Sequence, residues 1–176
     1  RHDLEARGHR FRSRGDTEVV LNALAEWGTD ALPRFDGMFA FALWDRETRT
    51  LTLARDRYGI KPLYTALCGQ SVLFASEIKA FYAHPAFRAA IDTEGVREYF
   101  TFQNFFTRRT LFSGVEILPA GTTLSVSADD DVLGKPRRYW DFAFTEPGAP
   151  ESEDRLIEQV ASGFETGVRR QLVSDV

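Results

Sequence analysis

The segment Gly37-Met-Phe-Ala-Phe-Ala-Leu-Trp-Asp45 decides the fold, together with Ala54-Arg-Asp-Arg-Tyr-Gly-Ile-Lys-Pro-Leu-Tyr64, which follows it. In the first stretch both alternating sets of side chains are apolar, which predicts a β-strand covered on both faces. A polar turn follows at residues 45–48, and the apolar alternation resumes after it. The pattern therefore predicts a β-hairpin with strands at residues 38–44 and 50–55.

Charged side chains follow at the end of this predicted hairpin: Arg55, Asp56, Arg57 and Lys61. Charges in such a place form either a structural ion-pair cluster or part of a functional site. The residues alone favour the structural alternative, because such networks are common and perturb one another without doing chemistry. We interpret Arg55, Asp56 and Lys61 as a charge network that braces the turn at Gly59 and Pro62.

Helical and strand patterns extend over the rest of the chain. Asp16 is predicted to be the N-cap of a helix over residues 17–27, because its carboxylate suits the free N–H groups of a first turn. After residue 152, an apolar series that begins with Leu156 and Val160 has helical spacing. Further expected elements are the end of a helix at residues 3–8, a hairpin of 63–67 with 71–75, a helical turn at 77–82, a helix capped by Asp92 or Thr93 that runs through Phe100, β-structure over 111–126 broken at 119–121, and a linker at 145–152.

Composition narrows the class of protein. The 176 residues, 43% of them apolar, suffice for one domain and part of another. A net charge of −4 with scattered basic residues gives no reason to expect nucleic acid as a partner. The single cysteine excludes internal disulfides, and no apolar run approaches the roughly 20 residues of a membrane span. His2, His9 and His84 do not cluster with other metal ligands, so no metal site is expected, and the usual hydrolase and phosphate-loop motifs are absent.

Six motifs adjoin or overlap the hairpin stretch: Phe-Arg-Ser-Arg-Gly-Asp-Thr-Glu-Val-Val (11–20), Phe-Asp-Gly-Met-Phe-Ala (35–40), Ala-Ser-Glu-Ile-Lys-Ala (75–80), Leu-Pro-Ala-Gly (118–121), Arg-Tyr-Trp-Asp (138–141) and Arg-Arg-Gln-Leu-Val-Ser-Asp-Val (169–176). In this order and spacing they resemble the glutamine amidotransferase domain of glutamine-hydrolysing asparagine synthetases. These are class II amidotransferases of the N-terminal-nucleophile type. The resemblance covers nearly the whole chain.

The resemblance implies an α+β fold class. The expected architecture is an incomplete αββα sandwich of the N-terminal-nucleophile hydrolase type, followed by the first helix of an α/β ATP-pyrophosphatase-like synthetase domain. Residues 1–144 would then be the C-terminal part of the amidotransferase domain, 145–152 the linker, and 153–176 the start of the synthetase domain.

The family's chemistry implies that the full-length protein hydrolyses glutamine and passes ammonia to β-aspartyl-AMP, formed from aspartate and ATP with Mg²⁺. A cytoplasmic location is expected, no membrane partner is expected, and a homodimer is a candidate assembly. The family's nucleophile is an N-terminal cysteine, whereas Cys68 lies in a predicted turn. We therefore expect an interior fragment whose nucleophile and oxyanion element lie upstream of Arg1 and whose nucleotide loop lies beyond Val176. Alone it should bind no cofactor and catalyse nothing.

Two residues at the start of the first long helix are candidates for binding glutamine. In the family, the aspartate of the Gly-Asp pair receives the α-ammonium of glutamine, and Asp16 matches that position. A carboxylate fixes an ammonium group by a charge-assisted hydrogen bond, and Gly15 would let the backbone approach the ligand closely. An N-cap role for Asp16 is compatible with this one.

Met38 and Ile60 match positions that line the ammonia tunnel of asparagine synthetases. Ammonia must cross between active sites without meeting water, because protonation abolishes its nucleophilicity. Apolar side chains serve that purpose, and methionine is a flexible lining residue. From the sequence alone, ordinary packing in the core accounts for both residues equally well.

Two alternatives to an asparagine synthetase stay open. One is a related amidotransferase that amidates another carboxylate, and the other is a β-lactam-synthetase-like protein whose N-terminal domain is not catalytic. The Gly-Asp pair at 15–16 argues mildly against the second alternative, because a lost site has no need of an ammonium-binding aspartate. The first differs from an asparagine synthetase in a substrate pocket that the resemblance places beyond Val176.

Overall fold

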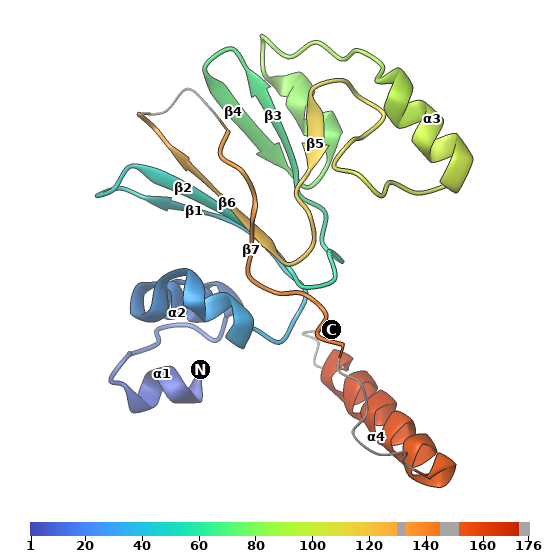
Figure 1. Ribbon diagram of the computed structural model, residues 1–176. Helices are drawn as coiled ribbons and strands as arrows, with labels where there is room; N and C mark the ends of the chain where they lie inside the picture. Colours follow the sequence, from blue (N-terminus) through green and yellow to red (C-terminus); the bar gives the residue numbers. More distant parts are fainter. Residues whose placement is uncertain (130–132, 145–151, 173–176) are drawn as a thin grey trace. The chain divides into compact units, whose positions relative to one another are not determined.

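The computed structural model describes residues 1–129, 133–144 and 152–172. These residues form two units, Arg1–Asp141 and Phe142–Val176, and each is described by itself. The first unit contains two antiparallel sheets with helices packed against them (Figure 1). A mixed fold of helices and antiparallel sheets, as the sequence predicted, is confirmed.

The first sheet has the strand order β1-β2-β6-β7. Its first two strands form the predicted hairpin, with Ala40 opposite Arg55 and Asp45 opposite Thr50. The turn between them is closed by the carboxylate of Asp45, which accepts the N–H groups of Glu47 and Thr48. The bounds are β1 (Ala40–Asp45), β2 (Thr50–Arg55), β6 (Thr122–Ser127) and β7 (Arg137–Arg138).

The second sheet has the strand order β4-β3-β5 and contains the second predicted hairpin. Its strands are β3 (Tyr64–Cys68), β4 (Ser71–Ala75) and β5 (Val115–Ile117). The hairpin turns where Gly69 has a φ of +61°, in the left-handed region that glycine adopts without strain.

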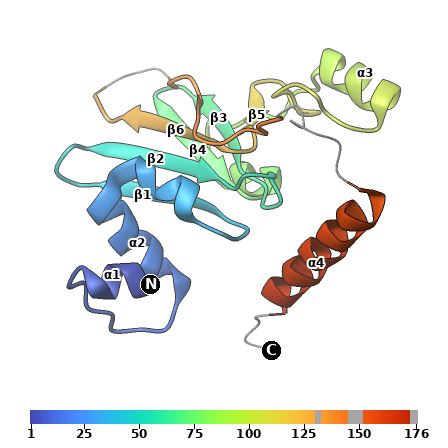
Figure 2. The same cartoon turned by 60° about the horizontal axis from the view of Figure 1, so that its bottom comes forward.

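Helices account for most of the remaining regular structure, and Figure 2 shows α2 lying against the first sheet. In the first unit they are α1 (His2–Ala6), α2 (Asp16–Trp27), η1 (Gly28–Arg34), η2 (Ile78–Ala83) and α3 (Thr93–Phe102). Asp92 caps α3 by accepting the N–H of Gly95, as one of the two predicted alternatives required. The second unit contains α4 (Glu153–Gln171), which begins after Ser152 as its N-cap. Apart from Ser152, the predicted linker lies outside the described residues. No helix in the described part of the chain is long and apolar enough to cross a membrane.

The prediction that Asp16 is the N-cap of α2 is wrong. Gly15 occupies that position, with φ −70° and ψ 150°, and Asp16 is the first residue of the helix. No side chain caps this helix end by a hydrogen bond. A carboxylate one position inside the helix has lost the extended backbone geometry from which an N-cap side chain reaches back to the first-turn N–H groups.

Three apolar clusters hold the first unit together. One contains Leu53 and Leu124 of the first sheet, with Val72 of the second sheet packed against it. Another joins α1 and α2 to Phe41 and Leu43 of β1. A third lies on the second sheet, where its members are Ala66, Phe81, Phe87 and Val115.

The expectation that the first strand is covered on both faces is met on one face only. Phe41 and Leu43 pack in the cluster with α2, whereas Ala42 is exposed and Trp44 is 48% exposed. The cluster on the other face takes its buried members from β2, β6 and the segments at Leu63 and Leu118, and β1, at the edge of the sheet, adds only the partly buried Ala40 to it. An edge strand thus carries a core-like sequence with only one buried face.

Candidate functional site

The loop before α2 is held by Glu18. Its carboxylate accepts the N–H groups of Arg12 at 2.8 Å and Ser13 at 2.7 Å, and also the Ser13 hydroxyl at 2.7 Å. These hydrogen bonds, the one from the Arg12 N–H first, lower the pKa of Glu18. Sequence reasoning missed this residue, although a glutamate three positions after an N-cap is a known signal for such a reach back to the preceding loop.

The side chain of Asp16, in contrast to that of Glu18, takes no part in holding the loop before α2 among the residues that the structure describes. Asp16 is exposed, and among the described residues the structure gives its side chain no hydrogen bond or ion pair. It stands at the first position of a 12-residue helix, where the aligned peptide dipoles favour a negative charge. A charged oxygen acceptor is therefore held in place and available to a cationic ligand.

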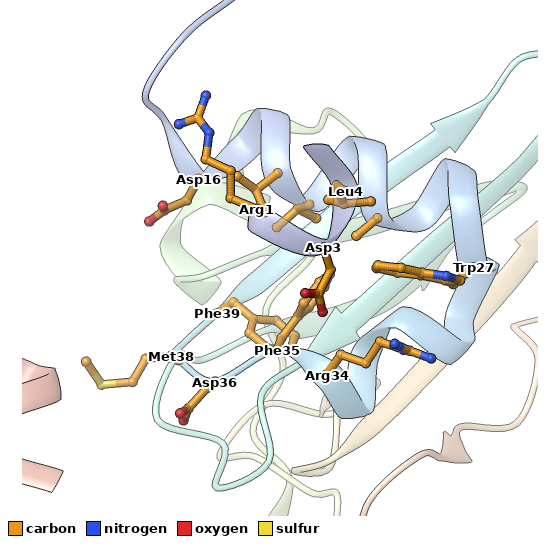
Figure 3. Close-up of a pocket in the computed structure, with 14 residues that line it drawn as sticks. Arg1, Asp3, Leu4, Asp16, Trp27, Arg34, Phe35, Asp36, Met38 and Phe39 are labelled. Atoms are coloured by element: carbon orange, nitrogen blue, oxygen red, sulfur yellow. The ribbon is translucent and has the colours of Figure 1, made fainter. Parts of the chain in front are cut away.

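Asp16 borders two hollows of the first unit. The smaller has a volume of about 320 Å³, and Figure 3 shows Arg1, Leu4, Trp27 and Phe35 among its lining residues. The larger, of about 500 Å³, runs along α2 and the edge strand β1. These volumes match those of small-molecule sites, which take about 300–1,000 Å³.

Four residues line both hollows: Asp16, Val20, Met38 and Phe39. The two hollows therefore adjoin, and Asp16 and Met38 lie where they meet. The side chains of Asp16 and Met38 extend toward the same side of the smaller hollow in Figure 3. Both hollows have a mostly apolar lining, and Asp16 places a carboxylate at the edge of each.

The other two predicted site residues lie differently. Ile60 lines neither hollow and is 53% exposed, whereas its neighbours Lys61 and Pro62 line the larger one. Gly15 lines neither, and a Cβ placed on it would meet only the hydroxyl of Ser13, at 3.7 Å. Met38, 41% exposed, is not a core residue within the described chain. The structure thus brings together Asp16 and Met38, and leaves Ile60 and Gly15 outside the lining.

The turn after β2 is organised by Asp56, which is 1% exposed. Its carboxylate accepts the N–H groups of Tyr58 at 3.1 Å, Ile60 at 3.0 Å and Lys61 at 2.9 Å. Its backbone oxygen accepts the N–H of Gly59 at 3.1 Å. Every backbone N–H from residue 58 to residue 61 therefore donates to this one aspartate.

Arg55, which is 9% exposed, stabilises the same turn by donating hydrogen bonds to the carbonyl groups of the turn. Its guanidinium donates to the backbone oxygens of Gly59 and Lys61 and, across the fold, to that of Leu118 at 2.7 Å. Burial lowers the pKa of Arg55 below the usual value for arginine. The predicted bracing role is confirmed for Arg55 and Asp56, but they brace the turn through hydrogen bonds to its backbone, and the described residues show no ion pair among Arg55, Asp56 and Lys61. For Lys61, the structure shows only its backbone groups taking part in the bracing.

The comparison with known protein families defines the class of protein to which this chain belongs. The glutamine amidotransferase domain family matches residues 1–140, and this chain belongs to that family.

Individual relatives in this class include two proteins of Bacillus subtilis (strain 168). Asparagine synthetase [glutamine-hydrolyzing] 3 is 40% identical over 177 residues, which cover 100% of this chain and 28% of that protein. Asparagine synthetase [glutamine-hydrolyzing] 1 is 34% identical, covering 100% and 27%. Amidase chry2 of Gibberella zeae is 31% identical over 95% of this chain and 24% of that protein. The chain thus spans about a quarter of the length of these curated relatives.

Proposed function

We propose that this chain is part of an ATP-dependent asparagine synthetase. In this proposal residues 1–144 belong to a glutamine-hydrolysing αββα sandwich of the N-terminal-nucleophile type, 145–152 are the linker, and 153–176 begin the synthetase domain. The family match over residues 1–140, the two antiparallel sheets and the similarity to glutamine-hydrolysing asparagine synthetases support it.

A single observation carries the proposal: the exposed carboxylate of Asp16, which has no hydrogen bond or ion pair to the described parts of the chain, lies where two hollows of the domain meet. Asp16 would accept the α-ammonium of glutamine, and a charge-assisted hydrogen bond of this kind is stronger than a neutral one. Gly15 has an ordinary φ of −70°, and a side chain there would meet one protein atom at 3.7 Å. The backbone conformation therefore does not require glycine, and the room beside Gly15 suits a ligand that approaches the backbone.

Ammonia transfer would use the mostly apolar side of the same region. Met38 would line the path within the larger hollow, whereas Ile60, which lines neither hollow, would line it only where it continues beyond that hollow. Their exposures of 41% and 53% leave room for a wall supplied by parts of the full-length protein outside these 176 residues. The nucleophile, the oxyanion element and the sites for aspartate, ATP and Mg²⁺ would also lie outside these residues. This chain's own contribution is to bind and orient glutamine and to exclude water.

A second candidate function is amidation of another carboxylate by a related amidotransferase. The similarity to amidase chry2, whose name does not mention asparagine, favours keeping this candidate. The β-lactam-synthetase-like alternative predicts instead that glutamine is not hydrolysed at all. All three candidates are separated by one assay of the full-length protein.

That assay supplies the full-length protein with glutamine labelled with ¹⁵N in its amide, together with aspartate and Mg-ATP. We expect labelled asparagine, with one glutamate formed for each asparagine. If the label enters a product other than asparagine when a panel of carboxylic acids is offered, the second candidate replaces asparagine synthesis. The absence of any glutamine hydrolysis would overturn the proposal.

A further inference from the structure

The turn at residues 57–62 forms part of the wall of the larger hollow, although it contains no helix or strand. Lys61 and Pro62 line that hollow together with Asp16 and Met38. A connecting segment without its own repeating hydrogen bonds needs other groups to fix its conformation. Here those groups are the two buried side chains of Arg55 and Asp56.

Asp56 joins two walls of the hollow directly. While its carboxylate accepts the N–H groups of the turn, its own N–H donates to the backbone oxygen of Phe39 at 2.8 Å. Phe39 lines the hollow and follows Met38 in the chain. The position of Lys61 relative to Met38 is therefore set through hydrogen bonds of one buried residue.

Arg55 donates to the backbone carbonyl groups of the same turn and leaves no room for a side chain at Gly59. Gly59 has a φ of +65°, and a Cβ built on it would lie 2.9 Å from Cζ of Arg55 and 3.1 Å from Cβ of Ala120. Tyr139 adds a further tie, because its hydroxyl donates to the backbone oxygen of Arg55 at 2.8 Å. Burial of that phenol raises the pKa of Tyr139 to about 12, so the hydroxyl stays protonated and keeps donating near neutral pH.

We propose that Arg55 and Asp56 are positioning residues that hold the turn at 57–62 against the segment of Met38 and Phe39 before β1, so that ammonia released from glutamine stays in the larger hollow during transfer. The inference rests on the proposed function. Neither side chain touches substrate in this proposal, and both act through the turn. A turn that moved away from β1 would open the hollow to water, and ammonia would be lost by protonation and escape.

The sharpest test is Asp56→Asn in the full-length protein. Oδ1 accepts two N–H groups and would continue to do so, but Oδ2, which accepts the N–H of Lys61, is replaced by an NH₂ donor. The side chain keeps its volume, and the contact with Lys61 becomes donor against donor. We expect glutamine hydrolysis within about twofold of wild type, while amide product per glutamate falls to about half or below, since a small displacement is enough to spoil a transfer geometry. Hydrogen exchange at the Lys61 amide should accelerate in parallel.

Asp45→Asn is the matched control. Asp45 also accepts backbone N–H groups in a turn, at Glu47 and Thr48, but it lines neither of the two hollows beside α2. We expect its ratio of product to glutamate to equal that of wild type. Gly59→Ala is the second variant, because its Cβ pushes against Arg55 without removing any hydrogen-bonding group, and it should lower the ratio as well.

The outcomes separate the inference from the proposed function. A wild-type protein that hydrolyses no glutamine overturns both. A wild type that couples hydrolysis to synthesis, with Asp56→Asn and Gly59→Ala that couple equally well, overturns the inference alone. The inference is also overturned if hydrolysis and synthesis fall in proportion, or if neither variant folds, because either result assigns the pair a structural role only.

Discussion

Asp16 begins a helix and Asp56 begins a turn, yet the surroundings of the two carboxylates differ in exposure and in hydrogen bonding. Asp56 is 1% exposed, and its carboxylate accepts three backbone N–H groups. Asp16 is exposed, and within the described residues its carboxylate accepts none. A carboxylate whose acceptor capacity is filled holds the fold, whereas one that the fold leaves open at the rim of a hollow is available to a ligand. The difference gives Asp56 a structural role, and it supports the proposal that Asp16 recognises glutamine.

Asp92 is intermediate between them. It accepts the N–H of Gly95 at 3.0 Å as the cap of α3, and its second oxygen accepts Arg109 at 2.9 Å. The hydrogen bond from Gly95 contributes most to lowering the pKa of Asp92, with Arg109 adding to it. The three aspartates thus form a series in which structural cost on removal should rise with the number of hydrogen bonds accepted.

The largest structural effect is expected for Asp56→Ala. The substitution leaves three backbone N–H groups without their acceptor beside the buried guanidinium of Arg55. We expect the free energy of unfolding to fall by about 3–5 kcal/mol, because each buried unsatisfied donor costs about 1–3 kcal/mol. Urea unfolding followed by tryptophan fluorescence measures this. A loss no greater than that of Asp92→Ala would break the proposed ordering.

A carboxylate introduced at Met38 should produce the next largest effect, on transfer rather than on stability. Met38→Asp places a charge and its water in the mostly apolar lining, and we expect the ratio of asparagine to glutamate to fall while glutamine hydrolysis continues. The control is Leu67→Asp, since Leu67 has a similar exposure of 43% and lines neither of the two hollows beside α2. An unchanged ratio in a stably folded Met38→Asp protein would place Met38 off the path.

Asp92→Ala should have the smallest effect of the three variants and should lower Tm by only a few degrees. The reason is that only a helix cap and one exposed ion pair are lost. Its pH dependence has a definite sign. The folded-state pKa of Asp92 is lowered, so its contribution is complete above the unfolded value of about 3.9 and is lost as the pH falls through the folded pKa. The Tm gap between wild type and variant should therefore narrow at acid pH in thermal scans. A gap independent of pH would show that charge plays no part.

The hairpins could be predicted from sequence because their signals are local. Alternating apolar residues and a polar turn at 45–48 define the first, and a glycine suited to positive φ ends the first strand of the second. The core-like sequence of β1 suggested two buried faces, since a sequence pattern does not reveal that a strand lies at the edge of its sheet.

The sequence does not predict that the carboxylate of Asp56 is buried and hydrogen-bonded while that of Asp16 is exposed. Asp16 precedes a helix and suited an N-cap, but the backbone angles of Gly15 put the cap one residue earlier. In the sequence, Asp56 is one of several neighbouring charged residues, and nothing there distinguishes it from the others. Its hydrogen bonds depend on the conformation of the turn, in which Gly59 has a φ of +65°. Ile60 was assigned to the ammonia tunnel from the family resemblance alone. In the structure its neighbours Lys61 and Pro62 line the larger hollow, and Ile60 does not.

Whether Asp16 recognises glutamine is tested most directly by an Asp16→Asn variant of the full-length protein, in which the dependence of synthesis on glutamine is measured. Asparagine keeps the shape and removes the charge that would meet the α-ammonium. We predict that KM for glutamine rises about 10- to 100-fold, because a charge-assisted hydrogen bond is lost. Synthesis driven by free ammonia should remain at the wild-type rate, and Asp30→Asn, an exposed aspartate that lines neither of the two hollows beside α2, should change neither activity. If KM for glutamine is unchanged, or if glutamine-driven and ammonia-driven synthesis fall together, Asp16 does not recognise glutamine and the account is contradicted.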